Sequence, residues 1–233
     1  MSSPIANNSK NFVQQLMVKS HQKLAHNQRI NYLAHFFIQL VDKLKLANKK
    51  VIDIGCGDMT LAASLQKQWV DCNMHCVDTY PLPSDLKELS TWQKYTAYDG
   101  HVLPFENQSM DIALLCDVLH HDFEQATQLL NEALRVAKVV LLKDHFEYGF
   151  VSRQTLRLMD FVGNWGYGVS IPKRYYSLSS FEQQLEQLRY AEEIERICPI
   201  PLYEHHFLFR HLCPAKLQFV SVLKSSYQNT SYE

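Results

Sequence analysis

Short apolar blocks alternate with helical repeats along most of the chain. The blocks are rich in valine, isoleucine and leucine, as strands buried inside a sheet are. They predict seven strands, at residues 51–54, 74–78, 94–98, 111–117, 139–142, 192–197 and 217–223. The strand at 94–98 has the weakest pattern of the set.

Between these blocks, apolar residues recur every three or four positions, which is typical of amphipathic helices. Helices are predicted at residues 29–46, 61–69, 124–137 and 181–188, with a weaker repeat at 12–17. Strands that alternate with helices form βαβ units. The predicted fold class is therefore α/β: a doubly wound, seven-stranded, mostly parallel sheet with helices on both faces.

The length of 233 residues is long for one domain and short for two, so we expect one core with additions. Residues 1–47 are predicted to form an N-terminal helical cap, and residues 48–233 the sheet domain. An insertion after the fifth strand, at about residues 145–180, is rich in aromatic side chains. Together these parts are expected to form one compact unit.

Composition narrows the possible partners. Apolar residues make up 46% of the chain and the formal net charge is -1, so no overall basic field favours nucleic acid. No apolar run is long enough to cross a membrane, and the N-terminus lacks the pattern of a secretory signal. The six cysteines include no C-x-x-C pair, which favours reduced thiols and a cytoplasmic location. Nothing in the composition indicates the oligomeric state.

A glycine turn follows the first strand, in the stretch VIDIGCGDMT at residues 51–60. A strand, a Gly-x-Gly turn and a helix bring backbone amides close to a ligand. Acidic residues close the neighbouring strands, at Asp78, Asp99 and Asp117. So many carboxylates disfavour a pyrophosphate and favour a ligand with a positive centre, an amino group and free ribose hydroxyls.

These segments resemble the class I S-adenosylmethionine-dependent methyltransferases, in particular the small-molecule, type-11-like group. Residues 51–60 are similar to the first motif of that family, and Asp78 matches the acidic residue that closes its second strand. The run from Asp99-Gly100 through Leu-Pro-Phe to Ser-x-Asp, at residues 99–111, is similar to the third motif. The fourth is matched by DVLHH at residues 117–121. The resemblance covers about residues 48–145 and implies a Rossmann-like fold.

The resemblance implies S-adenosylmethionine as cofactor and assigns parts to individual residues. Gly55 and Gly57 would pass close to the methionine part, and Asp78 would bind the ribose hydroxyls. Asp99 would accept from the adenine amino group. The full implied cofactor set is Asp53, Gly55, Gly57, Asp78, Thr79, Asp99, Gly100, Cys116 and Asp117. Met59 stands near the position where the family usually has a third glycine, which eases packing more than it touches ligand.

A methyl acceptor that carries a proton benefits from a positioned base. Lys143-Asp144-His145 ends the fifth strand at the ligand-binding edge, so His145 is the first candidate for that base and His121 the second. The competing interpretation of each is a structural histidine. The histidines and cysteines do not fall at zinc spacings, so no metal site is expected. The third glycine of a nicotinamide fingerprint is also missing, at Thr60.

The insertion supplies the candidate acceptor site. An aromatic wall with a cationic rim suits a partly apolar acceptor with an acidic group. The candidates for substrate binding are Trp165, Tyr167, Arg174 and Tyr175. Gly163, Gly166 and Gly168 suggest a hinge for a lid; without one, Tyr32 and His35 of the N-terminal helix are the next candidates.

The predicted function is methyl transfer from S-adenosylmethionine to an oxygen or nitrogen atom of a small, partly apolar metabolite. The alternative is a non-catalytic regulatory or scaffold protein that binds the same cofactor. A macromolecular acceptor, RNA or protein, is a lesser option because the chain carries almost no net charge. Turnover of a labelled methyl group separates these possibilities.

Overall fold

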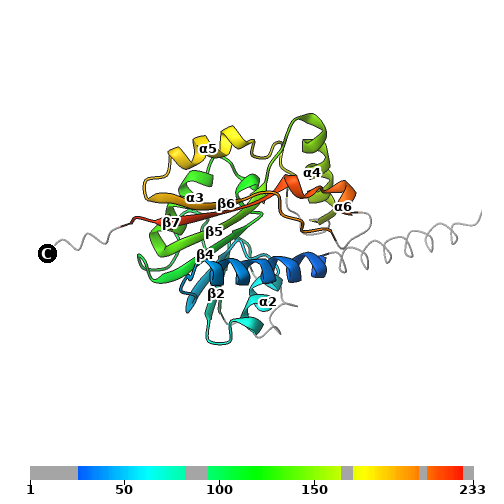
Figure 1. The fold of residues 1–233 in the computed structure, drawn as a ribbon. Coiled ribbons are helices and arrows are strands. Elements are labelled where there is room, and N and C mark those ends of the chain that lie inside the picture. Colours follow the sequence, from blue (N-terminus) through cyan, green and yellow to red (C-terminus); the bar gives the residue numbers. More distant parts are fainter. Residues whose placement is uncertain (1–25, 82–93, 164–169, 205–208, 228–233) are drawn as a thin grey trace, which may run out of the picture.

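The computed structural model describes residues 26–81, 94–163, 170–204 and 209–227, and Figure 1 shows their arrangement. The predicted repeat at residues 12–17 and the glycines at 166 and 168 lie outside these ranges. None of the described helices is long and apolar enough to cross a membrane.

A single seven-stranded sheet organises the molecule, in the order β3-β2-β1-β4-β5-β7-β6. Every neighbouring pair from β3 to β5 is parallel, whereas β7 runs antiparallel to both β5 and β6. The strands are β1 (Lys50–Ile54), β2 (Asn73–Asp78), β3 (Tyr95–Ala97), β4 (Met110–Cys116), β5 (Ala137–His145), β6 (Ala191–Ile197) and β7 (Gln218–Ser225). The predicted mostly parallel, Rossmann-like sheet is confirmed.

Alternation along the strands divides the core into two layers. Successive residues of β4 point to opposite faces, so Ile112 and Leu114 join one apolar cluster and Ala113 and Leu115 the other. The helix of residues 26–43 and α2 (Thr60–Gln68) cover the first face. The second face is covered by α3 (Ala126–Val136) and α5 (Leu178–Glu186). Figure 1 shows these helices on the two sides of the sheet.

The N-terminal helix of residues 26–43 packs directly on the sheet. Leu33 and Phe37 are almost fully buried and share a cluster with Val51 of β1 and Leu65 of α2. Burying each such side chain contributes about 1.5–3 kcal/mol. The helix therefore shares its core with the sheet.

Three elements differ from the sequence prediction. Strand β5 extends beyond residue 142, because Lys143, Asp144 and His145 keep their pairing with β7. The sequence prediction ends this strand at residue 142 because the next three residues are polar. The aromatic insertion contains α4 (Phe150–Gly163), so Gly163 ends a helix. A short helix, α6 (Phe209–Leu212), was not predicted.

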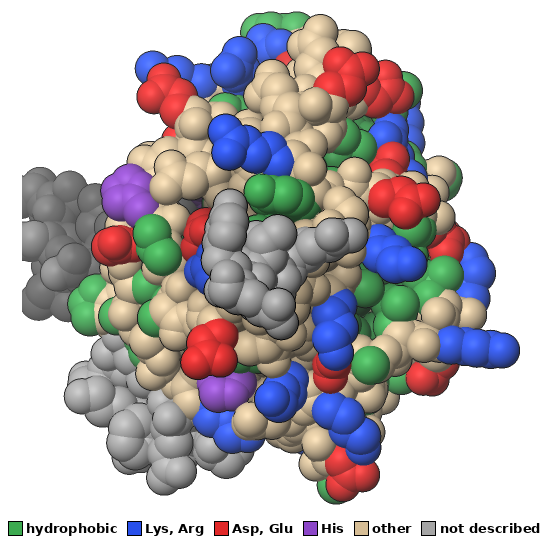
Figure 2. Space-filling model, turned by 90° about the vertical axis from the view of Figure 1, so that its left-hand side faces the viewer, with side chains coloured by type: hydrophobic (Ala, Val, Ile, Leu, Met, Phe, Trp, Pro, Cys, Tyr) green, Lys and Arg blue, Asp and Glu red, His purple; other side chains and the backbone are tan. Residues whose placement is uncertain are grey.

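The surface carries charges of both signs. On the face seen in Figure 2, acidic and basic side chains are interspersed with small apolar groups. All six cysteines are free thiols. The mixed charge of this face agrees with the near-zero net charge of the sequence.

Candidate functional site

The turn after β1 is built from residues with positive φ angles. Gly55 has φ of 70° and Gly57 of 52°, a region that favours glycine. A Cβ atom at Gly55 would lie 2.6 Å from Cγ2 of Val118, so the turn packs closely against the segment after β4. A Cβ at Gly57 would meet nothing within 4 Å. The turn thus leaves open space at its second glycine, as a bound ligand requires.

Met59 shows why a third glycine is dispensable here. Its φ of 58° is also left-handed, yet its side chain is completely buried in the core. The left-handed conformation costs a non-glycine residue about 1–2 kcal/mol. Burial of the thioether side chain offsets this cost.

Replacing Met59 with glycine, which restores the family pattern, should therefore destabilise the protein. Loss of a buried methionine costs about 2–5 kcal/mol and relief of strain returns about 1–2, so we expect a net loss of up to about 4 kcal/mol in the free energy of unfolding. Urea denaturation measures it. A more stable variant would show that backbone strain, and not packing, dominates at this position.

Asp78 ties the end of β2 to the glycine turn. Its Oδ2 accepts from the amide of Gly57 at 2.9 Å, and its Oδ1 accepts from the amides of Thr79 at 2.7 Å and Tyr80 at 3.3 Å. Register in the parallel pair of β1 and β2 makes this contact possible, because both strands end at the same edge. The hydrogen bond from Gly57 to Asp78 therefore holds the end of β2 against the glycine turn after β1.

Asp99 and Gly100 follow β3 at the same edge. Asp99 is exposed and accepts from the amides of His101 at 2.8 Å and Val102 at 3.0 Å, which lowers its pKa. Gly100 has φ of 84°, and a Cβ there would lie 3.2 Å from Cγ2 of Thr79. The ends of β2 and β3 are therefore in contact through Thr79 and Gly100.

Asp53 is a buried carboxyl group inside β1, with 2% of its surface exposed. Burial raises its pKa to about 7, and the negative charges of Asp78 and Asp58 add to the effect. A carboxyl group held in this way gains from a positively charged ligand group nearby, because such a group favours the ionised form.

Cys116 and Asp117 lie at the end of β4. Burial raises the pKa of the Cys116 thiol, so it stays neutral. Asp117 has a positive φ of 58° and forms ion pairs with Arg29 of the N-terminal helix and with Lys143 of β5. Two cations from distant segments therefore compete with any ligand for Asp117.

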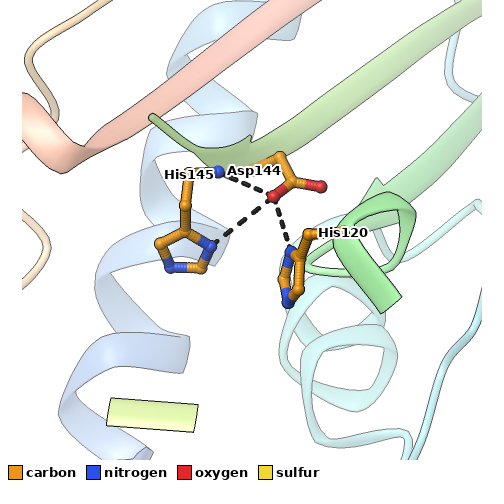
Figure 3. Close-up of side chains that lie close together, drawn as sticks. All are labelled: His120, Asp144 and His145. Carbon is orange, nitrogen blue, oxygen red and sulfur yellow. Dashed lines mark hydrogen bonds and ion pairs between the residues drawn. The ribbon is translucent and has the colours of Figure 1, made fainter. Parts of the chain in front are cut away.

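A buried polar cluster lies beside this edge, at the ends of β4 and β5 (Figure 3). His120 donates through Nδ1 to Oδ1 of Asp144 at 2.6 Å, and both side chains are fully buried. The backbone amide of His145 donates to the same oxygen at 2.7 Å. The Nδ1 atom of His145 lies 3.6 Å from it. Asp144 thus holds His120 in a fixed orientation.

The other ring nitrogen of His120 faces α4. Its Nε2 lies 3.5 Å from Oδ2 of Asp160, and Asp160 also accepts a hydrogen bond from the hydroxyl of Tyr175. Burial alone would lower the pKa of His120, but the charges of Asp144 and Asp160 outweigh it and raise that pKa. The two carboxylates therefore stabilise the protonated, positively charged form of His120.

His145 and His121 have different surroundings. Burial, reinforced by the neighbouring Lys143, lowers the pKa of His145 to about 3. Nζ of Lys143 lies 3.3 Å from its Nε2, and burial with Arg29 nearby lowers the pKa of Lys143 to about 7. Burial and the adjacent His120 also lower the pKa of His121.

Several buried polar atoms of this cluster have no hydrogen-bond partner among the described residues. They are Nε2 of His120, Nδ1 of His121, Oδ2 of Asp144 and Nδ1 of His145. Unpaired buried polar atoms are costly and mark places where water or a ligand binds. Four of them in one cluster point to a polar binding site.

Three side chains of the same cluster are close enough together to hold a metal ion. Ligand atoms of His120, Asp144 and His145 lie within 4.8 Å of one another. A metal-bound histidine usually donates its second ring N–H to an acceptor. Here the second nitrogen of His145 faces the amino group of Lys143, which cannot act as an acceptor while charged. This arrangement favours a proton-carrying cluster over a metal centre.

A separate hollow of about 510 Å³ lies over the outer side of α3. Its lining includes His101, Glu132, Arg135 and Arg189, and none of the predicted cofactor residues. The strand-end groups described above therefore form a site distinct from this hollow.

The predicted site residues fall into three groups. The nine cofactor candidates all lie in or next to the turns that follow β1, β2, β3 and β4, with Asp53 inside β1. Of the substrate candidates, Trp165 and Tyr167 lie outside the described residues. Arg174 is exposed and stacks over Phe123 at 5.0 Å, whereas Tyr175 is buried at 2% exposure.

Sequence reasoning missed the residues that organise the buried cluster. The sequence pattern favours His121 over His120 as a base, and Asp144 appears in it only as a neighbour of His145. Asp160 had no signal at all, because its partner His120 is distant in sequence and meets it only through α4. The adjacent pair His120-His121 was the one available hint.

Comparison with known proteins agrees with this geometry. Residues 52–139 match the family model described as a methyltransferase domain. A search of curated protein sequences finds no significant match to the chain.

Solved structures share the fold at low sequence identity. A putative methyltransferase in complex with the Haloferax volcanii Trm112 activator has a TM-score of 0.64 at 12% identity, over 89% of this chain and 95% of that one. An S-adenosylmethionine-dependent methyltransferase from Methanosarcina mazei has a TM-score of 0.56 at 15% identity, over 78% and 94%. The mitomycin 7-O-methyltransferase MmcR has a TM-score of 0.59 at 15% identity, over 91% of this chain and 57% of that protein.

At these sequence identities the similarity concerns the fold alone. The candidate site residues are therefore taken from the geometry of this structure. The strand order, the glycine turn joined to Asp78 and the match of residues 52–139 to a methyltransferase domain support a class I S-adenosylmethionine-dependent methyltransferase, and this similarity indicates S-adenosylmethionine as the cofactor.

Proposed function

We propose that the protein transfers a methyl group from S-adenosylmethionine to an oxygen or nitrogen atom of a small, partly apolar metabolite, and that a hydroxyl group is the favoured acceptor. The observation that carries this proposal is the buried pair of His120 and Asp144, with an unpaired Nε2 on His120. A neutral hydroxyl must lose its proton during transfer, and this nitrogen can take it when the imidazole is neutral, above the raised pKa of His120.

The residues at the strand ends fit the cofactor. Gly57 borders open space, and the carboxylates of Asp78 and Asp99 offer acceptors for the ribose hydroxyls and the adenine amino group. Asp53 supplies a buried acidic group that a positive charge would stabilise. The cofactor supplies a methyl group on a positively charged sulfur, and the chain aligns it with the acceptor.

The cluster lies next to the residues proposed to bind the cofactor. Val118, two residues before His120, packs against Gly55 of the glycine turn. Asp117 is linked through Lys143 to the strand that carries Asp144. An acceptor held between the glycine turn and His120 would therefore be close to both the methyl group and the base.

Charge balance also supports His120 as the proton acceptor. Bound S-adenosylmethionine would supply the methyl group from a positively charged sulfur, so transfer to the acceptor oxygen would remove that positive charge. The hydroxyl proton moves to Nε2 of His120, so a positive charge appears there, facing Asp144 and Asp160. The buried region keeps the same total charge, which avoids a large desolvation cost.

His145 and His121, the bases expected from the sequence, are weaker candidates in this arrangement. A neutral imidazole whose pKa is near 3 has little affinity for a proton at neutral pH. Tyr175 is proposed to act through Asp160, to which it donates a hydrogen bond. Arg174, exposed over Phe123, is proposed to meet an acidic group of the acceptor.

The cofactor assignment has a direct test. Asp78→Ala should weaken binding of S-adenosylhomocysteine by about 1.5–3 kcal/mol, the range for hydrogen bonds to a charged group. Isothermal titration calorimetry measures it. An analogue without the ribose hydroxyls should bind wild type and variant with equal affinity. Unchanged affinity for S-adenosylhomocysteine itself would place the ribose elsewhere.

Turnover separates the enzyme from its alternative, a non-catalytic protein that binds the same cofactor. A labelled-methyl transfer screen against metabolite fractions should show incorporation into a small molecule. Cofactor binding without any incorporation, across metabolite, RNA and protein fractions, would favour the regulatory or scaffold function.

A further inference from the structure

Helix α4 turns its more apolar side outward. Phe150 is 73% exposed, Val151 78%, Leu158 53% and Phe161 43%. With 3.6 residues per turn these four side chains lie on one face of the helix. The inner face carries Leu156, which is 1% exposed, and Asp160. The exposed Gln154 lies on the same face, between Val151 and Leu158. Exposed apolar side chains gathered in a stripe on one face mark an interaction surface, unlike scattered ones.

Basic residues border this stripe. Residues 146–178 contain four of them against two acidic residues, in a chain whose net charge is -1. Both acidic residues are engaged internally: Glu147 pairs with Arg153 and accepts from the amide of Tyr175, and Asp160 accepts from its hydroxyl. Because Arg153 is neutralised by its pair with Glu147, the remaining basic residues of this segment are Arg157, Lys173 and Arg174.

Further contacts bring more positive charge to the same region. Nζ of Lys216 lies 5.9 Å from the ring of Tyr148, which is 55% exposed just before the helix. The hydrogen bond from Tyr175 to Glu147 brings the exposed Lys173 and Arg174 to the start of α4. An apolar stripe with a cationic border is complementary to a partner that is apolar inside and anionic at its surface.

The positive charge around the outer face of α4 favours some binding partners over others. A second copy on a two-fold axis would bring the same basic residues face to face, which is unfavourable. The N-terminal residues 1–25 contain three lysines and no acidic residue, so they would be repelled from this border as well. An anionic lipid surface accepts apolar side chains at the acyl boundary and basic side chains at the headgroups.

We propose that the outer face of α4 docks on an anionic lipid surface. This contact is interfacial and needs no helix that spans a membrane. It does not depend on the proposed function. The inner face of the same helix places Asp160 beside His120, so docking would bring the buried cluster close to the bilayer.

Vesicle flotation with the full chain tests this surface. The wild type should float with phosphatidylcholine vesicles that contain about 30% phosphatidylglycerol, and much less with phosphatidylcholine alone. Raising the salt concentration should weaken the interaction. The double variant Phe150→Glu, Val151→Glu should bind anionic vesicles about tenfold more weakly or worse, because it places charges in the acyl boundary.

Val70→Glu is the matched control. Val70 is 79% exposed and follows α2 directly, and Figure 1 shows α2 on the opposite side of the sheet from α4, so this variant should bind like the wild type. Both variants change only exposed side chains, and circular dichroism checks their fold. The proposal is overturned if the wild type ignores anionic vesicles or if the double variant binds as well as the wild type. A wild-type dimer that the double variant converts to a monomer in light scattering would assign the stripe to self-association instead.

Discussion

Replacing His120 with asparagine is expected to slow methyl transfer by about 10²- to 10⁴-fold, the usual contribution of a positioned base. Asparagine preserves a donor near the position of Nδ1, so the contact with Asp144 can persist and the fold is retained. The lost group is Nε2, the nitrogen that faces Asp160. The rate is measured with the acceptor found in the labelled-methyl screen.

Three readouts separate a catalytic role of His120 from a structural one. Affinity for S-adenosylhomocysteine should stay within about twofold of the wild type, because the cofactor residues are untouched. The wild-type rate should fall at low pH, where the imidazole is protonated, and the variant should lose this dependence. His211→Ala, at an exposed histidine of α6, should leave the rate unchanged. A variant that retains full activity would return the role to His145 or His121.

Asp144→Ala is expected to lower the free energy of unfolding by about 3–5 kcal/mol, because it leaves a buried imidazole without its partner. Asp144 is fully buried, and its carboxylate also accepts from the amide of His145. For a chain of this size the loss corresponds to a Tm lower by about 6–20 °C. Asp71→Ala is the control, since the Asp71 side chain is 85% exposed and its pairing with Lys49 contributes about 1 kcal/mol or less.

The stabilising effect of this pair should depend on pH in a defined window. Burial would raise the pKa of Asp144, but the neighbouring His120 outweighs it and holds that pKa below the usual range. The stability due to Asp144 is thus present above about pH 4 and is lost as the pH falls through its folded pKa. The pKa of His120 is raised, so its contribution is complete below about pH 6.5 and is lost as the pH rises through its folded pKa.

The difference in stability between wild type and Asp144→Ala should therefore be largest between about pH 4 and 6.5. Urea denaturation across this range measures it. A difference that grows steadily above pH 7 would mean that His120 is neutral in the folded protein and that the pair is not ionic.

Local patterns were sufficient for most of the sheet. Blocks such as residues 111–117 are apolar on both faces, and such a block can be buried only inside a sheet covered on both sides. The acidic residues at strand ends also followed from the sequence, since Asp78 and Asp99 directly follow or close predicted strands. The parallel topology then places them at one edge, which brings Thr79 against Gly100.

The buried cluster could not be predicted in the same way. The short 3-10 helix Leu119–His121 after β4 determines which of His120 and His121 points inward. The two histidines are adjacent in the sequence, so the local pattern of apolar and polar residues does not distinguish them. Asp144 interrupts an apolar strand and looked like its end. Its burial follows from pairing between β5 and β7, whose residues are separated by more than 70 positions.

The sequence by itself determined the fold class, the order of its strands along the chain and the acidic character of the edge where the cofactor is proposed to bind, because these depend on apolar periodicity and on residues next to strand ends. Only the tertiary structure decided that His120, Asp144 and Asp160 form one buried cluster and that α4 exposes its apolar face. The physical reason is that the pKa of a side chain and its access to solvent depend on what packs around it. In this protein those neighbours come from segments far apart in the chain: β4, β5 and α4 around His120, and the N-terminal helix through Arg29 and Asp117.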